Sequence, residues 1–162
     1  MKKFPAQQKA FTIIELIIVI TIMIVLAGSA LVSVISFNQN QGTTDDAKTV
    51  LTEMRRVYAK ATGVFYPNGC TNLTGYTVTI AKDSTDMSVT ANCAVSQTES
   101  RAGVLKTSKF RDAVSFTFSV PDGTVTPISP NVYPISITIY STNNSAATKT
   151  LTVSSYGVFQ LL

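Results

Sequence analysis

The sequence predicts an α+β protein in which one long amino-terminal helix packs on an antiparallel β-sheet of about five strands. Three observations lead to this prediction. Residues 16–44 carry no charge, and the first part of this run is mostly apolar. Apolar residues recur at helical spacing over residues 50–61. Residues 76–161 repeatedly alternate apolar with polar side chains. A chain of 162 residues suits one such domain with an appendage.

The apolar run is long enough to cross a membrane as a helix. Residues 16–35 include 13 Leu, Ile or Val, and a helix of about 20 residues spans a hydrocarbon layer of roughly 30 Å. Those 13 residues contribute about −4 to −8 kcal/mol to insertion, which exceeds the cost of at most about 3 kcal/mol for Glu15 at the edge of the run. Lys2, Lys3 and Lys9 precede it, so the amino terminus is expected in the cytoplasm and the rest of the protein outside a cytoplasmic (inner) membrane that it crosses once.

The helix is expected to continue past the membrane to about residue 62. Its apolar face repeats at intervals of four, three and four residues and consists of Val50, Met54, Val57 and Ala61, with Leu51 and Tyr58 alongside. Asp45 and Asp46 suit the first turn of this half, and Gly63 suits its end. Gly28 and Gly42 are the two positions at which the helix could break, and the sequence leaves that question open.

The last 100 residues follow the strand period of two. The alternating segments are residues 76–80, 87–93, 114–120, 135–140 and 150–154, and a short segment follows at 157–161. Turn-forming residues at 82–86 and 141–145 predict hairpins between neighbouring strands. Strict alternation gives each strand one buried face, and the apolar face of the helix is expected to cover it.

Two long segments between the predicted strands are expected to be loops, at residues 94–112 and 121–134. The first is locally basic, and a solvated surface is the plainer interpretation. The alternative is nucleic-acid contact, which needs several cations on one face. The candidate contacts are Arg101, Lys106, Lys109 and Arg111. The carboxy-terminal segment 155–160 has no basic residue.

Cys70 and Cys93 are the chain's two cysteines. The body of the protein is expected outside the cytoplasm, where disulfides persist, so we expect these two residues to be bridged. Two separate buried thiols are the alternative. A metal site is not expected, because two thiols without His form a poor ligand set.

Composition argues against catalysis and against general binding of polyanions. The chain has no His, which removes the commonest general base. The carboxylate pairs at 45–46 and 83–86 are explained by a helix start and a turn, and we expect neither an enzyme nor a cofactor. The 13 basic residues exceed the 9 acidic ones, but without Lys2, Lys3 and Lys9 the balance falls to 10 against 9.

The segment that opens the apolar run admits three interpretations. A conventional signal peptide would use the small residues at 27–30 for cleavage, yet the apolar run continues past them. A plain membrane anchor fits the length but leaves Glu15 unexplained. Residues 9–15 read Lys-Ala-Phe-Thr-Ile-Ile-Glu, and this pattern resembles the prepilin cleavage and N-methylation motif of type IV pilins and type II secretion pseudopilins.

The resemblance implies a processed structural subunit. Prepilin peptidase would cut between Ala10 and Phe11 and methylate the amine of Phe11, although Gly is usual where this chain has Ala10. In an assembling polymer, Glu15 of an incoming subunit would neutralise the amine of Phe11 on its neighbour. Residues 1–10 would then be a leader, residues 11–37 the transmembrane and polymerisation helix, and residues 38–162 the extracytoplasmic domain.

The resemblance favours a minor pilin or an H-type minor pseudopilin, with the membrane, prepilin peptidase and other pilin subunits as partners. It does not separate a pilus from a secretion system. Two alternatives stay open. One is a DNA-uptake minor pilin that binds DNA through the basic loop, and the other is a membrane-anchored binding module that never polymerises.

Overall fold

The computed structural model describes residues 12–162, apart from the side chains of residues 29–32. It divides into two compact units, one ending at Phe37 and the other running from Asn38 to Leu162. The second unit is the folded domain, and it contains all of the strands found within residues 12–162.

Helix α1 runs without a break from Ile13 to Thr62. Gly28 and Gly42 therefore do not interrupt it. Asp45 and Asp46, which the sequence placed in a first turn, lie in the middle of the helix instead. Gly42 has a different role, because a Cβ added there would lie 2.9 Å from Oγ1 of Thr107. A side chain at this position would force Thr107 to shift, so glycine permits the close approach of the neighbouring segment.

Nine strands follow the helix and form two antiparallel sheets. The strands are β1 (Gly75–Ile80), β2 (Met87–Asn92), β3 (Gln97–Arg101), β4 (Ser108–Phe110), β5 (Val114–Ser119), β6 (Val125–Ser129), β7 (Ile135–Ser141), β8 (Thr148–Val153) and β9 (Phe159–Leu161). The five-stranded sheet has the order β3-β2-β1-β5-β6, and the four-stranded sheet has the order β4-β7-β8-β9. Both predicted hairpins are present, β1 with β2 and β7 with β8.

The two segments predicted as loops contain three of these strands, which corrects the sequence prediction. Residues 94–112 include β3 and β4, and residues 121–134 include β6. Strand β3 has no apolar residue, so it lacks the alternation by which a strand is recognised. Strand β4 is three residues long, and β6 contains Pro127 at the edge of its sheet, where proline is tolerated.

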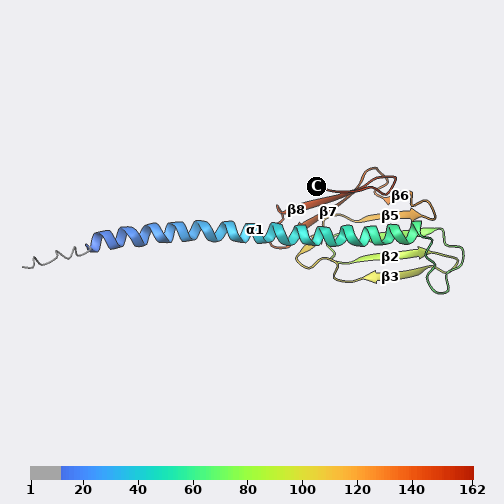
Figure 1. The fold of residues 1–162 in the computed structure, drawn as a ribbon, viewed down its shortest axis with the longest axis horizontal. Helices are drawn as coiled ribbons and strands as arrows, with labels where there is room; N and C mark the ends of the chain where they lie inside the picture. The colour runs from blue at the N-terminus through green and yellow to red at the C-terminus, as the bar shows by residue number, and fades with distance from the viewer. Residues whose placement is uncertain (1–11) are drawn as a thin grey trace, which may run out of the picture. The chain divides into compact units, whose positions relative to one another are not determined.

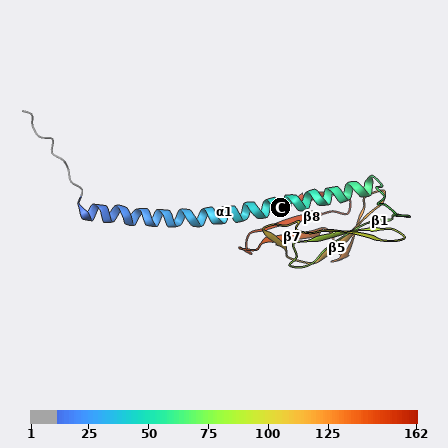
Figure 2. The same ribbon diagram turned by 90° about the horizontal axis from the view of Figure 1, so that it is seen from below.

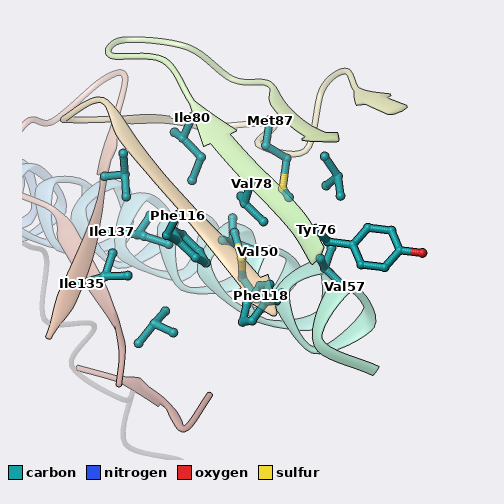
Figure 3. Close-up of a cluster of buried hydrophobic side chains, with 14 of the residues drawn as sticks. Val50, Val57, Tyr76, Val78, Ile80, Met87, Phe116, Phe118, Ile135 and Ile137 are labelled. Carbon is teal, nitrogen blue, oxygen red and sulfur yellow. The ribbon is translucent and has the colours of Figure 1, made fainter. Parts of the chain in front are cut away.

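The predicted core lies between α1 and the sheets. Val50, Met54, Val57 and Ala61 are fully buried, and Leu51 and Tyr58 pack beside them. Figures 1 and 2 show this half of the helix lying along one face of the five-stranded sheet. In Figure 3, Val50 and Val57 lie beside Phe116 and Phe118 of β5.

The opposite face of the five-stranded sheet is covered with hydroxyl groups. Its cross-strand pairs place one row of five threonines in register across the sheet, Thr98, Thr90, Thr77, Thr117 and Thr126. The hydroxyls of Thr77 and Thr117 are 2.7 Å apart, and those of Thr90 and Thr98 are 2.9 Å apart. This polar face explains the strict alternation of the sequence, because each strand has its core side chains on one side only.

Candidate functional site: the exposed amino-terminal helix and its anchoring

The first half of α1 exposes a continuous apolar surface. The large apolar residues between Ile13 and Leu26 are 40% to 80% exposed. By length and composition, α1 is the one helix among residues 12–162 that could cross a membrane, and none of its most apolar window is buried. Leaving so much apolar surface in water is costly, at roughly 25 cal/mol for each Å², so this half of the helix fits a lipid or protein environment.

Thr12 caps the amino terminus of this helix. Its hydroxyl accepts a hydrogen bond from the backbone N–H of Glu15 at 3.3 Å, and its carbonyl accepts one from the N–H of Leu16 at 3.2 Å. Thr12 and Glu15 have the Thr-x-x-Glu spacing of a capping box, and this spacing is a sequence signal for a helix that begins near residue 12. The exposed Glu15 carboxylate also lies in the first turn, where the helix dipole favours an anion.

The predicted cleavage site lies outside the described residues. Ala10 and Phe11 precede the described part of the chain, as do Lys2, Lys3 and Lys9. Processing at Ala10 and Phe11 and the assembly role of Glu15 therefore stay predictions.

Asp46 anchors the second half of α1 to the segment before β4. Its carboxylate accepts hydrogen bonds from the backbone N–H of Lys106 at 3.1 Å, and from the N–H and hydroxyl of Thr107 at 2.9 and 2.8 Å. Burial acts to raise the pKa of Asp46, but these hydrogen bonds together outweigh it, and the pKa lies below its ordinary value. Gly42, one turn earlier, leaves room for Thr107, so the two residues together fix this segment against the helix.

A second polar contact joins α1 to the edge strand β3, and we call it the α1–β3 charge cluster. It consists of Glu53, Arg56 and Lys60 on the helix and Glu99 and Arg101 on β3. Spacings of three and four residues place the helical members on one face of α1. The register pairs Glu99 with Val89 and Arg101 with Met87, both buried, so the two strand members face the helix.

Glu99 is the centre of this cluster. Its carboxylate lies 2.5 Å from Nη2 of Arg101, 3.2 Å from Nζ of Lys60 and 3.7 Å from Nη2 of Arg56. Burial acts to raise the pKa of Glu99, but the hydrogen bond and charge of Lys60 and the charges of the two arginines lower it overall. The cluster has three cations and two carboxylates, a formal charge of +1.

The four basic residues proposed for nucleic-acid contact do not share one loop. Arg101 lies in β3 and pairs with Glu99, whereas Lys109 lies in β4 of the other sheet. Lys106 uses its backbone N–H to hold Asp46. Arg111 donates to the carbonyl of Ser145 at 3.0 Å and lies over the ring of Tyr140. Local side-chain contacts thus account for Arg101 and Arg111, and phosphate binding by the set stays a prediction.

Cys70 and Cys93 form a disulfide, with their Cα atoms 5.4 Å apart. Cys70 lies in the connection between α1 and β1, and Cys93 directly follows β2. The bridge therefore holds that connection against the end of the β1–β2 hairpin. No cluster of His, Cys, Asp or Glu suited to a metal ion occurs within residues 12–162.

Comparison with known proteins gives a match at the amino-terminal end of the chain. No curated protein and no solved structure matches the chain significantly. The family model described as the prokaryotic N-terminal methylation motif matches residues 5–31. The matched segment contains residues 9–15, on which the resemblance was based, and most of the apolar run. Residues 5–31 thus carry the prokaryotic N-terminal methylation motif, which is the signature of type IV pilins and pseudopilins.

Proposed function

We propose that the chain is a structural subunit of a type IV pilus or a type II secretion pseudopilus, present as a minor component. The match of residues 5–31 to the methylation motif is the observation that supports this most strongly. The exposed apolar half of α1 adds support, since it offers a surface that can lie in lipid before assembly and against neighbouring helices afterwards.

Processing would create the group that Glu15 needs for assembly. Cleavage between Ala10 and Phe11 leaves a new amine four residues before Glu15, one helical turn away. Thr12 satisfies the backbone N–H of Glu15, and the exposed Glu15 carboxylate is accessible for pairing with an amine. In the polymer, that amine belongs to Phe11 of a neighbouring subunit. An unpaired carboxylate in lipid is costly, which makes this pairing a device for setting the register between subunits.

The proposed partners follow from this pathway. The precursor is inserted in the inner membrane and cleaved by prepilin peptidase. Other pilin or pseudopilin subunits then contact the helix of the mature protein. The amino terminus lies in the cytoplasm and the domain from Asn38 onward lies outside.

Intact mass and amino-terminal sequencing of the protein from its native membrane test the proposal. The expected product begins at N-methylated Phe11. A product that begins at Met1 contradicts the processing pathway and supports a plain anchor for a module that does not polymerise. A product that begins at Ala30 or Leu31 means secretion as a soluble domain, and it removes the structural role altogether.

A further inference from the structure

A cavity of about 240 Å³ lies in the folded domain between the end of α1 and strands β2 and β3. Buried Val89 and Ala91 of β2 line it, and Phe65 and Pro67 contribute apolar surface from the segment after the helix. Lys60 and Glu99 line it as well, and they are joined by the ion pair at 3.2 Å. Tyr76, Gln97 and Thr98 complete the lining, so the cavity combines apolar surface with polar and charged groups that can orient a small molecule.

The two charged residues that line the cavity, Lys60 and Glu99, balance each other, and the surrounding charge cluster is what favours an anion. The α1–β3 charge cluster carries one more cation than it has carboxylates. Among the described residues, Glu99 is the sole ion-pair partner of Lys60, whose ammonium also lies 5.6 Å from the centre of the Phe65 ring. Glu99 also pairs with Arg101 through its other carboxylate oxygen, Oε1, at 2.5 Å.

One unsatisfied donor makes Lys60 exchangeable. Nη2 of Arg56 is buried and has no hydrogen-bond acceptor within the described part of the chain, and it lies 3.7 Å from Glu99 Oε2, the same oxygen that pairs with Lys60. If Lys60 turned to another anion, Glu99 could close on Arg56 and complete that missing bond. Leaving a buried donor without a hydrogen bond is unfavourable. Forming the Arg56–Glu99 bond would therefore offset part of the free energy lost when Lys60 separates from Glu99.

We propose that this cavity binds a small carboxylate with an apolar body, whose carboxylate pairs with Lys60 while the body lies against Val89, Ala91 and Phe65. The volume is adequate, since a cavity of about 150 Å³ holds benzene. A cationic ligand is disfavoured because it would compete with three cations for Glu99. The proposal does not depend on the assembly role of the helix.

Methyl NMR on the full-length protein in lipid nanodiscs tests the proposal, with Ala and Val methyl groups labelled. Three probes share one ring and differ in charge: phenylacetate, phenylacetamide and phenethylamine. Phenylacetate is expected to shift the methyl signals of Val89 and Ala91 in a saturable manner, with an affinity about tenfold higher than that of the neutral amide. Equal affinities for phenylacetate and the amide, or shifts confined to other parts of the domain, would overturn the proposal.

Two variants identify the groups responsible. Lys60→Met keeps the aliphatic stem and removes the charge, and it is expected to lower phenylacetate affinity about tenfold without changing the binding of the amide. Lys48→Met is the matched control, because Lys48 also lies on α1 and pairs with one carboxylate, Asp45, at 3.6 Å. If Lys60→Met perturbs folding, Phe65→Ala serves instead and should weaken the binding of both probes. Unchanged binding in the folded Lys60 variant, or in the Phe65 variant, would count against the site.

Discussion

Val64 ends α1 in a backbone conformation that β-branched residues seldom adopt. Its φ is +50°, in the left-handed region, and the N–H of Phe65 reaches back to the carbonyl of Lys60 at 3.0 Å. This is the Schellman arrangement, in which glycine usually occupies the left-handed position. The sequence does have a glycine here, but Gly63 lies one residue too early, so the strain falls on Val64.

Val64→Gly is therefore expected to stabilise the domain. A non-glycine residue held in this region costs about 1–3 kcal/mol, and part of the gain is offset by the greater freedom of glycine in the unfolded chain. We expect a net gain of about 1 kcal/mol, or about 4 °C in the melting temperature, measured by circular dichroism. Val95→Gly is the control, since Val95 is exposed and is not among the residues with positive φ. A melting temperature that falls in both variants would contradict the prediction.

The ionisation of Asp46 makes the stability of the folded domain depend on pH. Its pKa is lower in the folded state than in the unfolded chain, so ionised Asp46 stabilises the fold above the unfolded value of 3.8. That stabilisation is lost as the pH falls further, through the folded pKa.

Asp46→Asn should lower the free energy of unfolding at pH 7 by about 1–3 kcal/mol, because it weakens the acceptor for three partly buried hydrogen bonds. The gap between the native protein and the variant should narrow below pH 4, as Asp46 itself becomes protonated. Denaturant unfolding across this pH range measures both effects. Asp45→Asn is the control, since Asp45 has an exposed pair with Lys48, and it should change stability little. A gap that stays constant with pH would show that the charge of Asp46 is unimportant.

At the scale of the element, α1 is one helix with two surfaces of different composition. Its first half exposes apolar residues, whereas its second half buries a narrow apolar face and presents Asp46 and the helical members of the α1–β3 charge cluster to neighbouring segments. The absence of proline between residues 12 and 62 lets the hydrogen-bonded ladder continue through both halves. One continuous helix can thus expose an apolar surface with its first half and pack against the folded domain with its second half.

The disulfide acts on the elements that follow the helix. It closes a sequence separation of 23 residues that includes the whole of β1 and β2. In the chain-entropy description, such a bridge stabilises a fold by about 3 kcal/mol. Reduction should accordingly lower the melting temperature of the native protein. The double variant Cys70→Ser, Cys93→Ser should already melt at the lower temperature and not respond to the reductant. An unchanged melting temperature on reduction of the native protein would mean that the bridge adds no stability.

At the scale of the whole molecule, the chain has a folded unit from Asn38 to Leu162 and a unit up to Phe37 whose described apolar side chains have no core of their own. Such a division fits a subunit whose first unit becomes buried only in a membrane or a polymer. Glu15 is the acidic residue within that exposed apolar surface. Replacing it tests whether the residue is needed for assembly.

Glu15→Val should leave membrane insertion intact or improved, because it removes a charge from the edge of the span. Its incorporation into sheared filaments should fall at least tenfold, as the amine of the neighbouring Phe11 loses its partner. Asp45→Ala is the control for removing an acidic residue from α1. Immunoblotting of the membrane and filament fractions measures both steps. Normal incorporation of the Glu15 variant would rule out the pairing.

The sequence by itself determined the features that depend on composition and period. These features are local patterns: the apolar run, the motif at residues 9–15, and the buried face containing Val50, Met54 and Val57. A local pattern can be recognised in the sequence when one face of an element lies entirely in lipid, in the core or in water. The two hairpins followed from their turn residues, and the pairing of Cys70 with Cys93 from the absence of any other cysteine.

Only the tertiary structure decided which elements pair and what the polar residues do. Alternation shows which face of a strand is buried but not which strand lies beside it, so β7 and β8 could not be assigned to a second sheet from the sequence. Strand β3 was missed because the face it turns toward α1 is charged, and its partners Glu53 and Arg56 lie more than 40 residues away in the chain. The role of Gly42 and the anchoring by Asp46 likewise depend on Thr107, a neighbour that only folding brings within hydrogen-bond distance.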